Sequence, residues 1–348
     1  MKNTRWKNRP ANSNWGEFGA DDQRGRMNWV TREKVLQGVA EVKEGLSFVL
    51  SLPLDYPGGN ALNPRRHPPR LAATQRNGRQ NFAYEVRQDN PMQTDVICDD
   101  LVLLTLQYST QWDSFAHVGG LFDADGDGKP EPVFYNGFRA GKEILPAQEN
   151  AAAESWAKFE GSRAEALGIQ NLAEHGAQGR GVLVDLHAHF GRKRLAVGYD
   201  DLMKILEQDQ VEVERGDIVC LHTGFAELVL ELKKNPNPEL LHNTCTGLDG
   251  RDEKLLQWIS DSGLSVLAAD NYAVELFSTT PWKPASHAML PLHEHCLFKN
   301  GIHLGELWWL TPLARWLRQA ERSRFLLTAP PLRLTGAAGS PVTPIATV

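Results

Sequence analysis

Short apolar runs that each end in a polar residue recur along this chain of 348 residues. Residues 181–185, 217–222 and 265–270 have the length and the Val, Ile and Leu content of buried strands, and they end at Asp185, His222 and Asp270. Predicted helices at 200–208 and 253–263 separate these strands. Strands that alternate with helices predict an α/β protein.

Other segments give weaker signals. We expect a helix from Thr31, as its N-cap, to Val42. Residues 56–95 are rich in Pro, Gly, Arg and Asn and are expected to be largely loop, with Arg65, Arg66 and Arg70 in solvent. The remaining predicted elements are strands at 47–54, 101–106 and 302–309, and helices near 140–146, 149–160, 161–174 and 293–300.

The composition argues against several classes of protein. Hydrophobic residues make up 41% of the chain, as in a globular protein with a large core. A net charge of −6 does not supply the basic field of a nucleic-acid surface. No run approaches the ~18 apolar residues of a membrane span, and the N-terminus lacks a signal-peptide core. We therefore expect a cytoplasmic protein whose four cysteines (Cys98, Cys220, Cys245 and Cys296) are reduced core residues.

The segment 107–117, Gln-Tyr-Ser-Thr-Gln-Trp-Asp-Ser-Phe-Ala-His, directly follows the apolar run 101–106. Its polar side chains Gln107, Gln111, Asp113 and His117 lie in apolar surroundings. An ionised Asp beside a His costs several kcal/mol there unless the two are paired or bind a metal. The segment is therefore a candidate site.

A second candidate lies near the C-terminus, between Pro291 and Glu306. His293 begins a predicted helix, and Glu306 ends an otherwise apolar run. A carboxylate in such a run needs a cation or a strong hydrogen-bond donor. Together, Asp113, His293 and Glu306 are the ligand types that a divalent metal requires.

These two segments resemble the cyclase family of metal-dependent hydrolases, which includes kynurenine formamidases and isatin hydrolases. The family signature reads H-x-G-T-H-x-D-x-P-x-H, with a later H-x-x-L-L-x-x-G-I-x-x-x-E. Thr110, Asp113 and His117 match the first pattern, in which Gln107 and Gln111 replace the two leading His residues. The second pattern is matched at His293, Leu297, Gly301, Ile302 and Glu306, with one extra residue before Gly301.

The resemblance implies a swivelling β/β/α cyclase-type fold, usually dimeric. We divide the chain into an N-terminal helical cap, residues 1–45, and a single cyclase-type catalytic domain, residues 46–348. By the resemblance, Gln107, Gln111, Asp113, His293 and Glu306 ligate one or two divalent metals. His117 takes the position of the catalytic acid/base.

The two glutamines change the expected metal. An amide oxygen is a harder and weaker ligand than an imidazole nitrogen, which favours Mn²⁺ or Mg²⁺ and leaves Zn²⁺ as an alternative. A single ion held by Asp113, Glu306, His293 and Gln111 fits better than a dinuclear site. The competing interpretation is a metal-free pocket whose glutamines only hydrogen-bond to Asp113.

The function that the resemblance implies is hydrolysis of a C–N bond in a small cyclic amide or aryl formamide by a metal-activated water. A lactonase or a ring-closing cyclase is an alternative enzyme. A metal-free binding or scaffold protein that keeps the fold is a further alternative. The nearby aromatic residues Trp112, Phe115, Trp308 and Trp309 suit either a flat, apolar substrate or core packing.

Two further motifs carry weaker signals. The run Asp123-Ala-Asp-Gly-Asp-Gly resembles the start of a calcium loop but lacks the later Glu, so a polar turn is the preferred interpretation and a structural cation is the alternative. His187 and His189 alternate after the strand that ends at Asp185, which predicts that they point the same way. A pair on the surface is expected there, with lining of the pocket mouth or metal binding as the alternatives.

Overall fold

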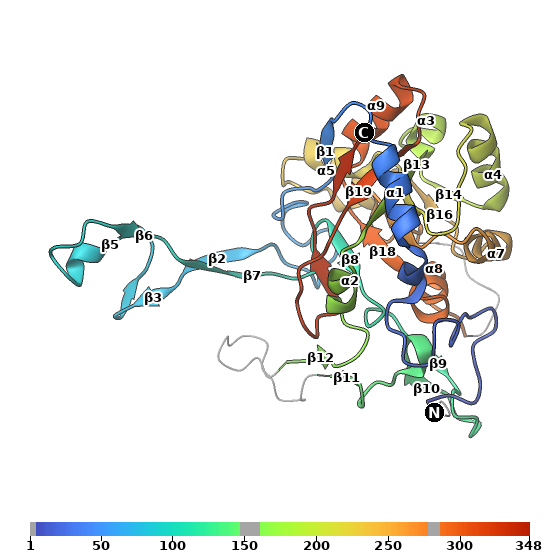
Figure 1. The fold of residues 1–348 in the computed structure, drawn as a ribbon, viewed down its shortest axis with the longest axis horizontal. Coiled ribbons are helices and arrows are strands. Elements are labelled where there is room, and N and C mark those ends of the chain that lie inside the picture. The colour runs from blue at the N-terminus through green and yellow to red at the C-terminus, as the bar shows by residue number, and fades with distance from the viewer. Residues whose placement is uncertain (1–4, 147–160, 278–285) are drawn as a thin grey trace.

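A mixed sheet of nine strands forms the centre of the protein, seen in a computed structural model that describes residues 5–146, 161–277 and 286–348 (Figure 1). Its strand order is β1-β21-β19-β13-β15-β17-β18-β8-β20. Strands β13, β15, β17 and β18 are parallel to their neighbours in this group, and the other pairs are antiparallel. The strands are β1 (Ser47–Val49), β8 (Gln111–Asp113), β13 (Gln178–Asp185), β15 (Ile218–His222), β17 (Val266–Ala269), β18 (His303–Glu306), β19 (Arg324–Thr328), β20 (Gly339–Pro341) and β21 (Ile345–Thr347).

Helices cover both faces of this sheet. They are α1 (Arg32–Ala40), α2 (Gln170–His175), α3 (Leu186–Phe190), α4 (Tyr199–Gln208), α5 (Phe225–Glu231), α6 (Pro238–His242), α7 (Glu253–Asp261), α8 (Pro291–His293), a π-helix (Glu294–Lys299) and α9 (Thr311–Gln319). Successive side chains of β13 pack into different hydrophobic cores on the two faces of the sheet. Val182 and Val184 pack in the same core as α4, α7 and the π-helix, whereas Leu183 packs in the core of α9. The predicted α/β class is confirmed.

Most predicted elements of the C-terminal half are present with shifted ends. The helix after Thr31 is also present, and the Thr31 side chain accepts a hydrogen bond from the Lys34 backbone N–H, as expected of an N-cap. Among the helices that the structure describes, none is long and apolar enough to cross a membrane.

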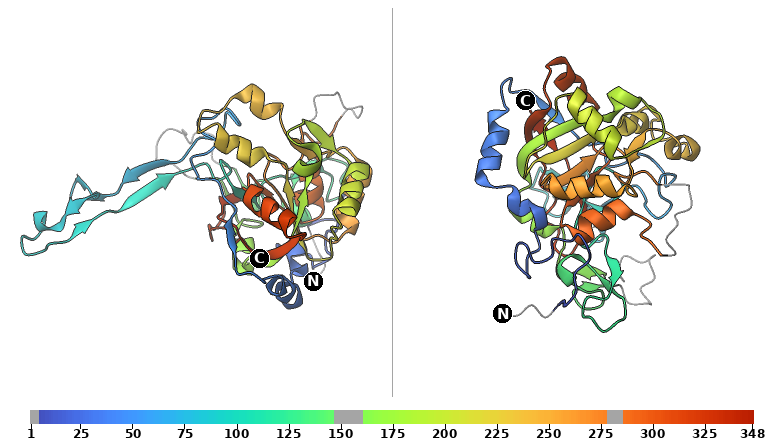
Figure 2. Two further views of the ribbon diagram at one scale, coloured as in Figure 1. Left: turned by 90° about the horizontal axis from the view of Figure 1, so that it is seen from above. Right: turned by 90° about the vertical axis from the view of Figure 1, so that its right-hand side faces the viewer.

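The segment after the first strand corrects two predictions. Residues 67–104, which we call the arm, form an antiparallel ribbon that reaches away from the body (Figures 1 and 2). Its pairs are β2 (Arg70–Ala73) with β7 (Asp100–Leu103), β3 (Gln75–Arg76) with β4 (Arg79–Gln80), and β5 (Tyr84–Glu85) with β6 (Val96–Ile97). The predicted loop therefore contains strands, and the predicted strand 101–106 is present only as far as Leu103, where it forms part of β7 in the ribbon. Its β-branched and apolar residues favoured a strand, but periodicity alone could not show that both faces are exposed.

One predicted helix is wrong, and another is present only in its last part. Residues 140–146 contain a turn and the short strand β11 (Ile144–Leu145), which pairs with β12 (Arg163–Ala164). Residues 161–174 are helical only from Gln170. The predicted helix 149–160 lies outside the described residues. The other short pairs are β9 (Gly120–Phe122) with β10 (Glu131–Val133) and β14 (Leu195–Val197) with β16 (Thr246–Leu248).

Gly301 joins the π-helix to β18 and fixes the spacing between His293 and Glu306. Its φ of +55° lies in the left-handed region. A Cβ at this position would lie 2.7 Å from the Tyr135 ring and 2.8 Å from the Gly25 backbone. The N-terminal segment docks here, because the Arg26 backbone N–H donates to the Gly301 carbonyl at 2.7 Å. Only glycine fits this junction without strain.

We expect Gly301→Ala to lower the free energy of unfolding by roughly 2–4 kcal/mol, the sum of left-handed strain and overpacking. Gly59→Ala is the matched control, because Gly59 has a φ of +54° and nothing within 4 Å of its added Cβ. The control should cost only about 1–2 kcal/mol. Urea unfolding measures both, and equal losses would show that crowding at Gly301 is unimportant.

Candidate metal centre

The register between β8 and β18 brings three of the predicted site residues to one face of the sheet. Glu306 lies directly opposite Gln111, and Leu304 lies opposite Asp113. Because side chains alternate along a strand, Gln111 and Asp113 point to the same side as Glu306. The intervening Trp112 points to the other side, where its ring packs edge-on against Trp308. All three polar side chains are buried.

His293 completes this group from the end of α8, where the π-helix begins. Its Nε2 lies 3.2 Å from Glu306 Oε1 and 3.9 Å from Asp113 Oδ2. One ligand atom from each of Asp113, His293 and Glu306 can be chosen so that all three lie within 4.8 Å of one another. A single cation can contact groups so spaced.

Glu275 holds His293 in place, and sequence reasoning missed it. Its Oε1 accepts hydrogen bonds from the His293 backbone N–H at 3.0 Å and from Nδ1 at 2.9 Å. Its Oε2 accepts from the Leu292 backbone N–H at 3.1 Å. A carboxylate on the far nitrogen is the usual partner of a metal-binding imidazole, because it fixes the tautomer and the ring orientation. The signal was available, since Glu275 is a carboxylate between apolar neighbours, as Glu306 is.

The buried charges of this group perturb one another. Burial, with the nearby Glu306 carboxylate, raises the pKa of Asp113. Burial opposes charge on His293, but the hydrogen bonds to Glu275 and Glu306 outweigh it and raise the pKa of His293 to about 10. Burial likewise opposes charge on Glu306, yet the contact with His293 lowers the pKa of that carboxyl.

Two buried oxygens in this group have no hydrogen-bond partner. Their presence indicates whether a cation would fit the group. They are Gln111 Oε1 and Asp113 Oδ2. The Gln111 Nε2 donates to Asp113 Oδ1 at 3.2 Å and to Glu306 Oε2 at 3.1 Å. An unsatisfied buried acceptor costs about 1–3 kcal/mol, and a cation would satisfy both oxygens. Three oxygen-bearing side chains and one imidazole fit a hard divalent ion.

His117 and Gln107 lie outside this group to different degrees. His117 Nε2 is 3.8 Å from Asp113 Oδ1, and its side chain is 22% exposed, so it borders the group and reaches solvent. Gln107 packs its amide against Gly339, the strand partner of Asp113. Within the described part of the chain, the Gln107 side chain makes no hydrogen bond to Asp113, His293 or Glu306.

Arg66 also borders the group, which corrects the prediction that it lies in solvent. Its side chain is 17% exposed, and its Nη1 lies 3.9 Å from Glu306 Oε2. The same nitrogen donates to the Gln107 carbonyl at 2.8 Å, and the guanidinium lies over the Tyr272 ring. Among the described residues, its Nε and Nη2 have no hydrogen-bond partner. Arg65 and Arg70 are exposed, as expected.

A cavity of about 370 Å³ has Glu275 among its lining residues. The aromatic residues Phe225, Tyr272 and Phe277 line it. This volume suits a small organic molecule. In contrast, Trp112, Phe115 and Trp308 are fully buried, so they belong to the core and do not line a pocket.

Comparisons with known proteins show the family of this chain. The family model described as "Putative cyclase" matches residues 50–276. The chain belongs to the cyclase family. A crystal structure of a novel cyclase is 30% identical, with 97% of each chain covered and a TM-score of 0.70. No curated protein sequence matches significantly.

Two isatin hydrolase A structures share the fold. The one from Labrenzia aggregata, bound to benzyl benzoate, is 12% identical, and the one from Ralstonia solanacearum is 13% identical. Each covers 91% of this chain with a TM-score of 0.53, and 98% and 97% of the respective relatives are covered. The expected cyclase-type fold is confirmed, and family membership supports a function of the hydrolase or cyclase type.

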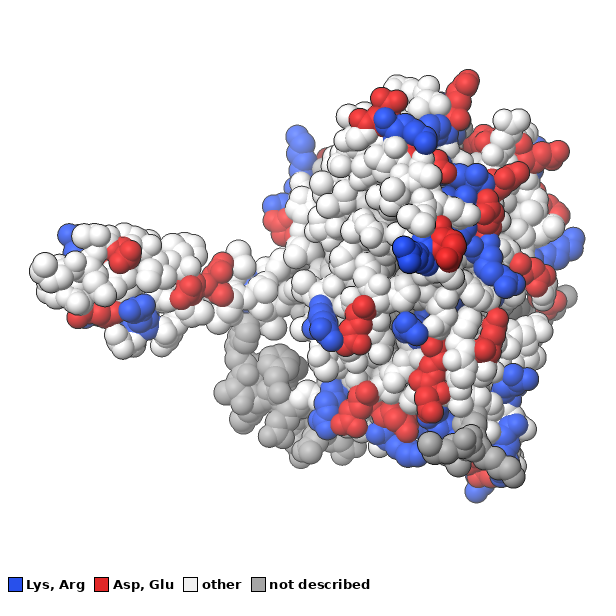
Figure 3. Space-filling view, in the orientation of Figure 1, with Lys and Arg blue, Asp and Glu red and all other residues white. Residues whose placement is uncertain are grey.

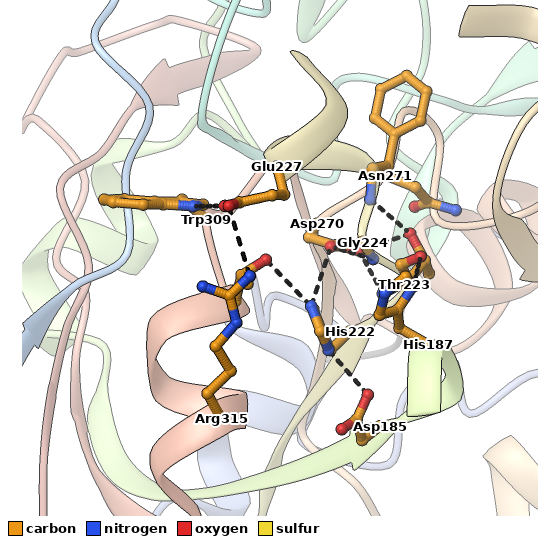
Figure 4. Close-up of polar contacts among 12 residues, drawn as sticks. Asp185, His187, His222, Thr223, Gly224, Glu227, Asp270, Asn271, Trp309 and Arg315 are labelled. Carbon is orange, nitrogen blue, oxygen red and sulfur yellow. Dashed lines mark hydrogen bonds and ion pairs between the residues drawn. The ribbon is translucent and has the colours of Figure 1, made fainter. Parts of the chain in front are cut away.

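The polar ends of β13, β15 and β17 meet in a second buried cluster (Figure 4). His222 Nδ1 lies 2.8 Å from Asp185 Oδ1, and its Nε2 lies 3.1 Å from Thr311 Oγ1 and 4.0 Å from Asp270 Oδ2. Asp270 accepts hydrogen bonds from the Thr223 backbone and hydroxyl and from the Gly224 backbone. This carboxylate therefore fixes the turn that follows β15.

Charge in this second cluster is balanced internally. Burial works against ionisation of Asp185, but hydrogen bonds from His222 and Arg318 lower the pKa of that carboxyl to about 2. Burial also opposes charge on His222, yet the flanking carboxylates raise its pKa. These strand ends thus pair with one another, and each charge has a partner. A structural role accounts for the whole cluster.

The weaker candidates take ordinary structural roles. His187 lies against the Thr223 carbonyl, whereas His189 pairs with Asp209, so the prediction that they point the same way is wrong. They lie on α3 and not on an extension of β13. Asp123 accepts hydrogen bonds from the backbone N–H groups of Gly126, Asp127 and Gly128, as in the expected polar turn.

We expect Asp185→Asn to lower the free energy of unfolding at neutral pH by roughly 3–5 kcal/mol, because it leaves His222 and Arg318 without their carboxylate. The control is Arg318→Met. The Arg318 side chain is 48% exposed, so its loss should cost no more than about 1 kcal/mol. Urea unfolding compares the two, and similar small losses would mean that this pair is dispensable.

Proposed function

We propose that this protein is a metal-dependent hydrolase that cleaves a C–N bond in a small cyclic amide or aryl formamide. The convergence of Asp113, His293 and Glu306, with unpaired oxygens on Asp113 and Gln111, carries this proposal. The fold and the family agree with it, and isatin, the substrate in the names of the two hydrolases above, is a cyclic amide.

Asp113, His293, Glu306 and Gln111 would hold the metal, with Mn²⁺ or Mg²⁺ preferred over Zn²⁺. When bound, a divalent ion supplies Lewis-acid catalysis, since it polarises a carbonyl and makes a water more acidic. Glu275 keeps the proton of His293 on Nδ1 and leaves the Nε2 lone pair free for coordination. Gln111 would turn its amide oxygen toward the ion.

His117 is the proposed acid/base. It lies 3.8 Å from Asp113 and reaches solvent, so it can take a proton from the attacking water and deliver it to the leaving nitrogen. Arg66 is the proposed anion contact. Its unused N–H groups can stabilise the oxyanion that develops during attack, and they can hold the carboxylate that hydrolysis of an amide or a lactone releases.

The cavity beside Glu275 is the proposed position of an aromatic part of the substrate. Phe225, Tyr272 and Phe277 offer flat, apolar walls, and Tyr272 also contacts Arg66. The same machinery serves lactone hydrolysis and ring closure, so isatin, N-formylkynurenine and simple lactones form the substrate panel.

A metal-free binding protein is the second candidate, because one observation favours it. The Gln111 amide already bridges Asp113 and Glu306, and a protonated His293 balances part of their charge. With these two contacts, the carboxylates of Asp113 and Glu306 can stay buried without a bound cation. Metal content separates the two candidates.

Protein purified without chelator should contain about one equivalent of divalent ion per chain and should hydrolyse at least one member of the panel when loaded with Mn²⁺. His117→Ala should abolish turnover and leave the metal content unchanged. Metal below about one-tenth of an equivalent, with no activity after Mn²⁺ or Zn²⁺ addition, would instead support the binding protein. Unchanged turnover would remove His117 from the acid/base role.

Glu275→Gln should weaken Mn²⁺ binding by roughly 10–100-fold, because the imidazole loses the carboxylate that orients it. Isothermal titration of the metal-free protein measures the affinity. Glu294→Gln is the control, since Glu294 is the neighbouring acid and pairs with Lys299 at 3.1 Å, away from His293. Its affinity should match the wild type, and a wild-type affinity in Glu275→Gln would contradict the proposed role.

A further inference from the structure

The cavity lined by Glu275 also contains two buried oxygens that lack a hydrogen-bond partner. They are Thr246 Oγ1 and Asn271 Oδ1. Thr246 is 1% exposed and Asn271 is 4% exposed, so bulk water does not satisfy these atoms. A buried polar atom in a native protein normally has a partner, and a molecule in the cavity can supply it. We propose that Thr246 and Asn271 bind the neutral amino group of an aromatic amine.

Asn271 presents an acceptor to the cavity and nothing else. Its Nδ2 donates to the Thr246 carbonyl at 3.1 Å and to the Val274 carbonyl at 3.2 Å, so both amide hydrogens are used. A half-turn of the amide would place its oxygen against these two carbonyl oxygens and would break both bonds. The orientation is therefore fixed, and only a hydrogen-bond donor can pair with Oδ1. The backbone is held as well, because the Leu307 N–H donates to the Asn271 carbonyl at 3.1 Å.

Thr246 belongs to the neighbouring part of the wall. It begins β16, whose three residues are all buried, and its carbonyl accepts one of the Asn271 hydrogen bonds. The Thr246 hydroxyl does not bond to Asn271 Oδ1, since neither atom has a partner. A hydroxyl can accept a hydrogen bond as well as donate one. The two oxygens therefore offer two acceptor positions to one ligand.

A neutral amino group fits these two acceptors better than a charged group does. Its two N–H bonds provide one donor for each oxygen, whereas a hydroxyl group provides only one donor. A buried ammonium needs a carboxylate partner. Among the described residues that line the cavity, the only carboxylate is Glu275, and Leu292 and His293 already donate to its oxygens. An anion would be repelled by the same carboxylate.

The walls of the cavity favour an aromatic skeleton for this amine. The rings of Tyr272 and Phe277 contact each other with centroids 5.6 Å apart, and Phe225 lines the same cavity. Asn63 Nδ2 donates to the Tyr272 hydroxyl at 3.0 Å, which holds this ring in place. A flat ring buries well against such walls. An amino group on an aromatic ring also stays neutral near neutral pH, because its lone pair is delocalised into the ring, whereas an alkyl amine is protonated.

Surface charge gives no competing signal for a macromolecular partner. On the face in Figure 3, acidic and basic side chains are interspersed over the body, and the arm is mostly uncharged. Charges of mixed sign do not build the strong local field that attracts a nucleic acid or an anionic membrane. The cavity is thus the feature whose chemistry selects a ligand.

The bound amino group would be a substituent away from the scissile bond. Among the described residues, the side chains of Thr246 and Asn271 make no hydrogen bond to the proposed metal ligands. The substrate class would therefore be an aryl amide or formamide that carries a further, unreacting amino group. This step from ligand to substrate rests on the proposed function, whereas binding of the amine does not.

Isothermal titration of the full chain with para-aminoacetophenone and para-methylacetophenone tests the binding. The two probes have nearly the same size, and only the first has an amino group. It should bind roughly 10–100-fold more tightly, as expected for two hydrogen bonds to otherwise unpaired buried groups. Thr246→Val removes the hydroxyl and keeps the shape of the side chain, so it should lower this preference at least ~5-fold. Thr246→Ser should restore the preference.

Thr244→Val is the matched control, because Thr244 lines the same cavity but is only half-buried. It should keep the wild-type preference. Equal affinities for the two probes, no binding of either probe, or a preference that Thr246→Val leaves unchanged overturns the proposal. Tighter binding of benzylamine, which is an ammonium ion at neutral pH, than of para-aminoacetophenone overturns the choice of a neutral group.

Turnover tests the substrate class separately. With the Mn²⁺-loaded protein, para-aminoformanilide should have a kcat/KM at least ~10-fold above that of para-methylformanilide, and Thr246→Val should reduce this ratio. Equal kcat/KM values for the two formanilides would overturn the step from ligand to substrate. The titration needs neither metal nor turnover, so failure of the amine site and failure of the hydrolase are distinguishable.

Discussion

The antiparallel pairing of β8 with β18 is the constraint on which the rest of the centre depends. It places Gln111 opposite Glu306 and puts Asp113 two residues further along the same face. A shift of one residue would replace these side chains with Trp112 and would move the charges into the tryptophan core. The hydrophobic core on the other face therefore stabilises this register, because Trp112 packs against Trp308 only in this alignment.

Part of the fold and part of the candidate site could be predicted from the sequence. Local signals sufficed for β13, β15 and β17, since each is a short apolar run with a clear end. Asp113, His293 and Glu306 stood out because a buried charge needs a partner, and the structure brings them together with Gln111. The cyclase-type fold followed from the family resemblance and not from periodicity.

Three of the failures share one cause, which is that contacts across long sequence distances decided them. The apolar run 101–106 has the pattern of a buried strand, but it pairs partly with residues near Leu71 in a ribbon that leaves the body. For the same reason Cys98, predicted to be a core residue, is exposed on that ribbon. Arg66 has the local sequence of a solvated loop, yet the chain folds it beside Glu306. Glu275 was visible by the same argument as Glu306 and was overlooked.

The single amide of Gln111 has a consequence for how the centre behaves when ions are scarce. An amide carries a donor at one end and an acceptor at the other, so a half-turn of its terminal group exchanges the two without moving the backbone. With its N–H groups inward, it links the Asp113 and Glu306 carboxylates that would otherwise repel each other. With its oxygen inward, it would be a ligand of the proposed cation. One side chain could thus serve the proposed loaded centre as well as the empty one by turning its terminal amide alone.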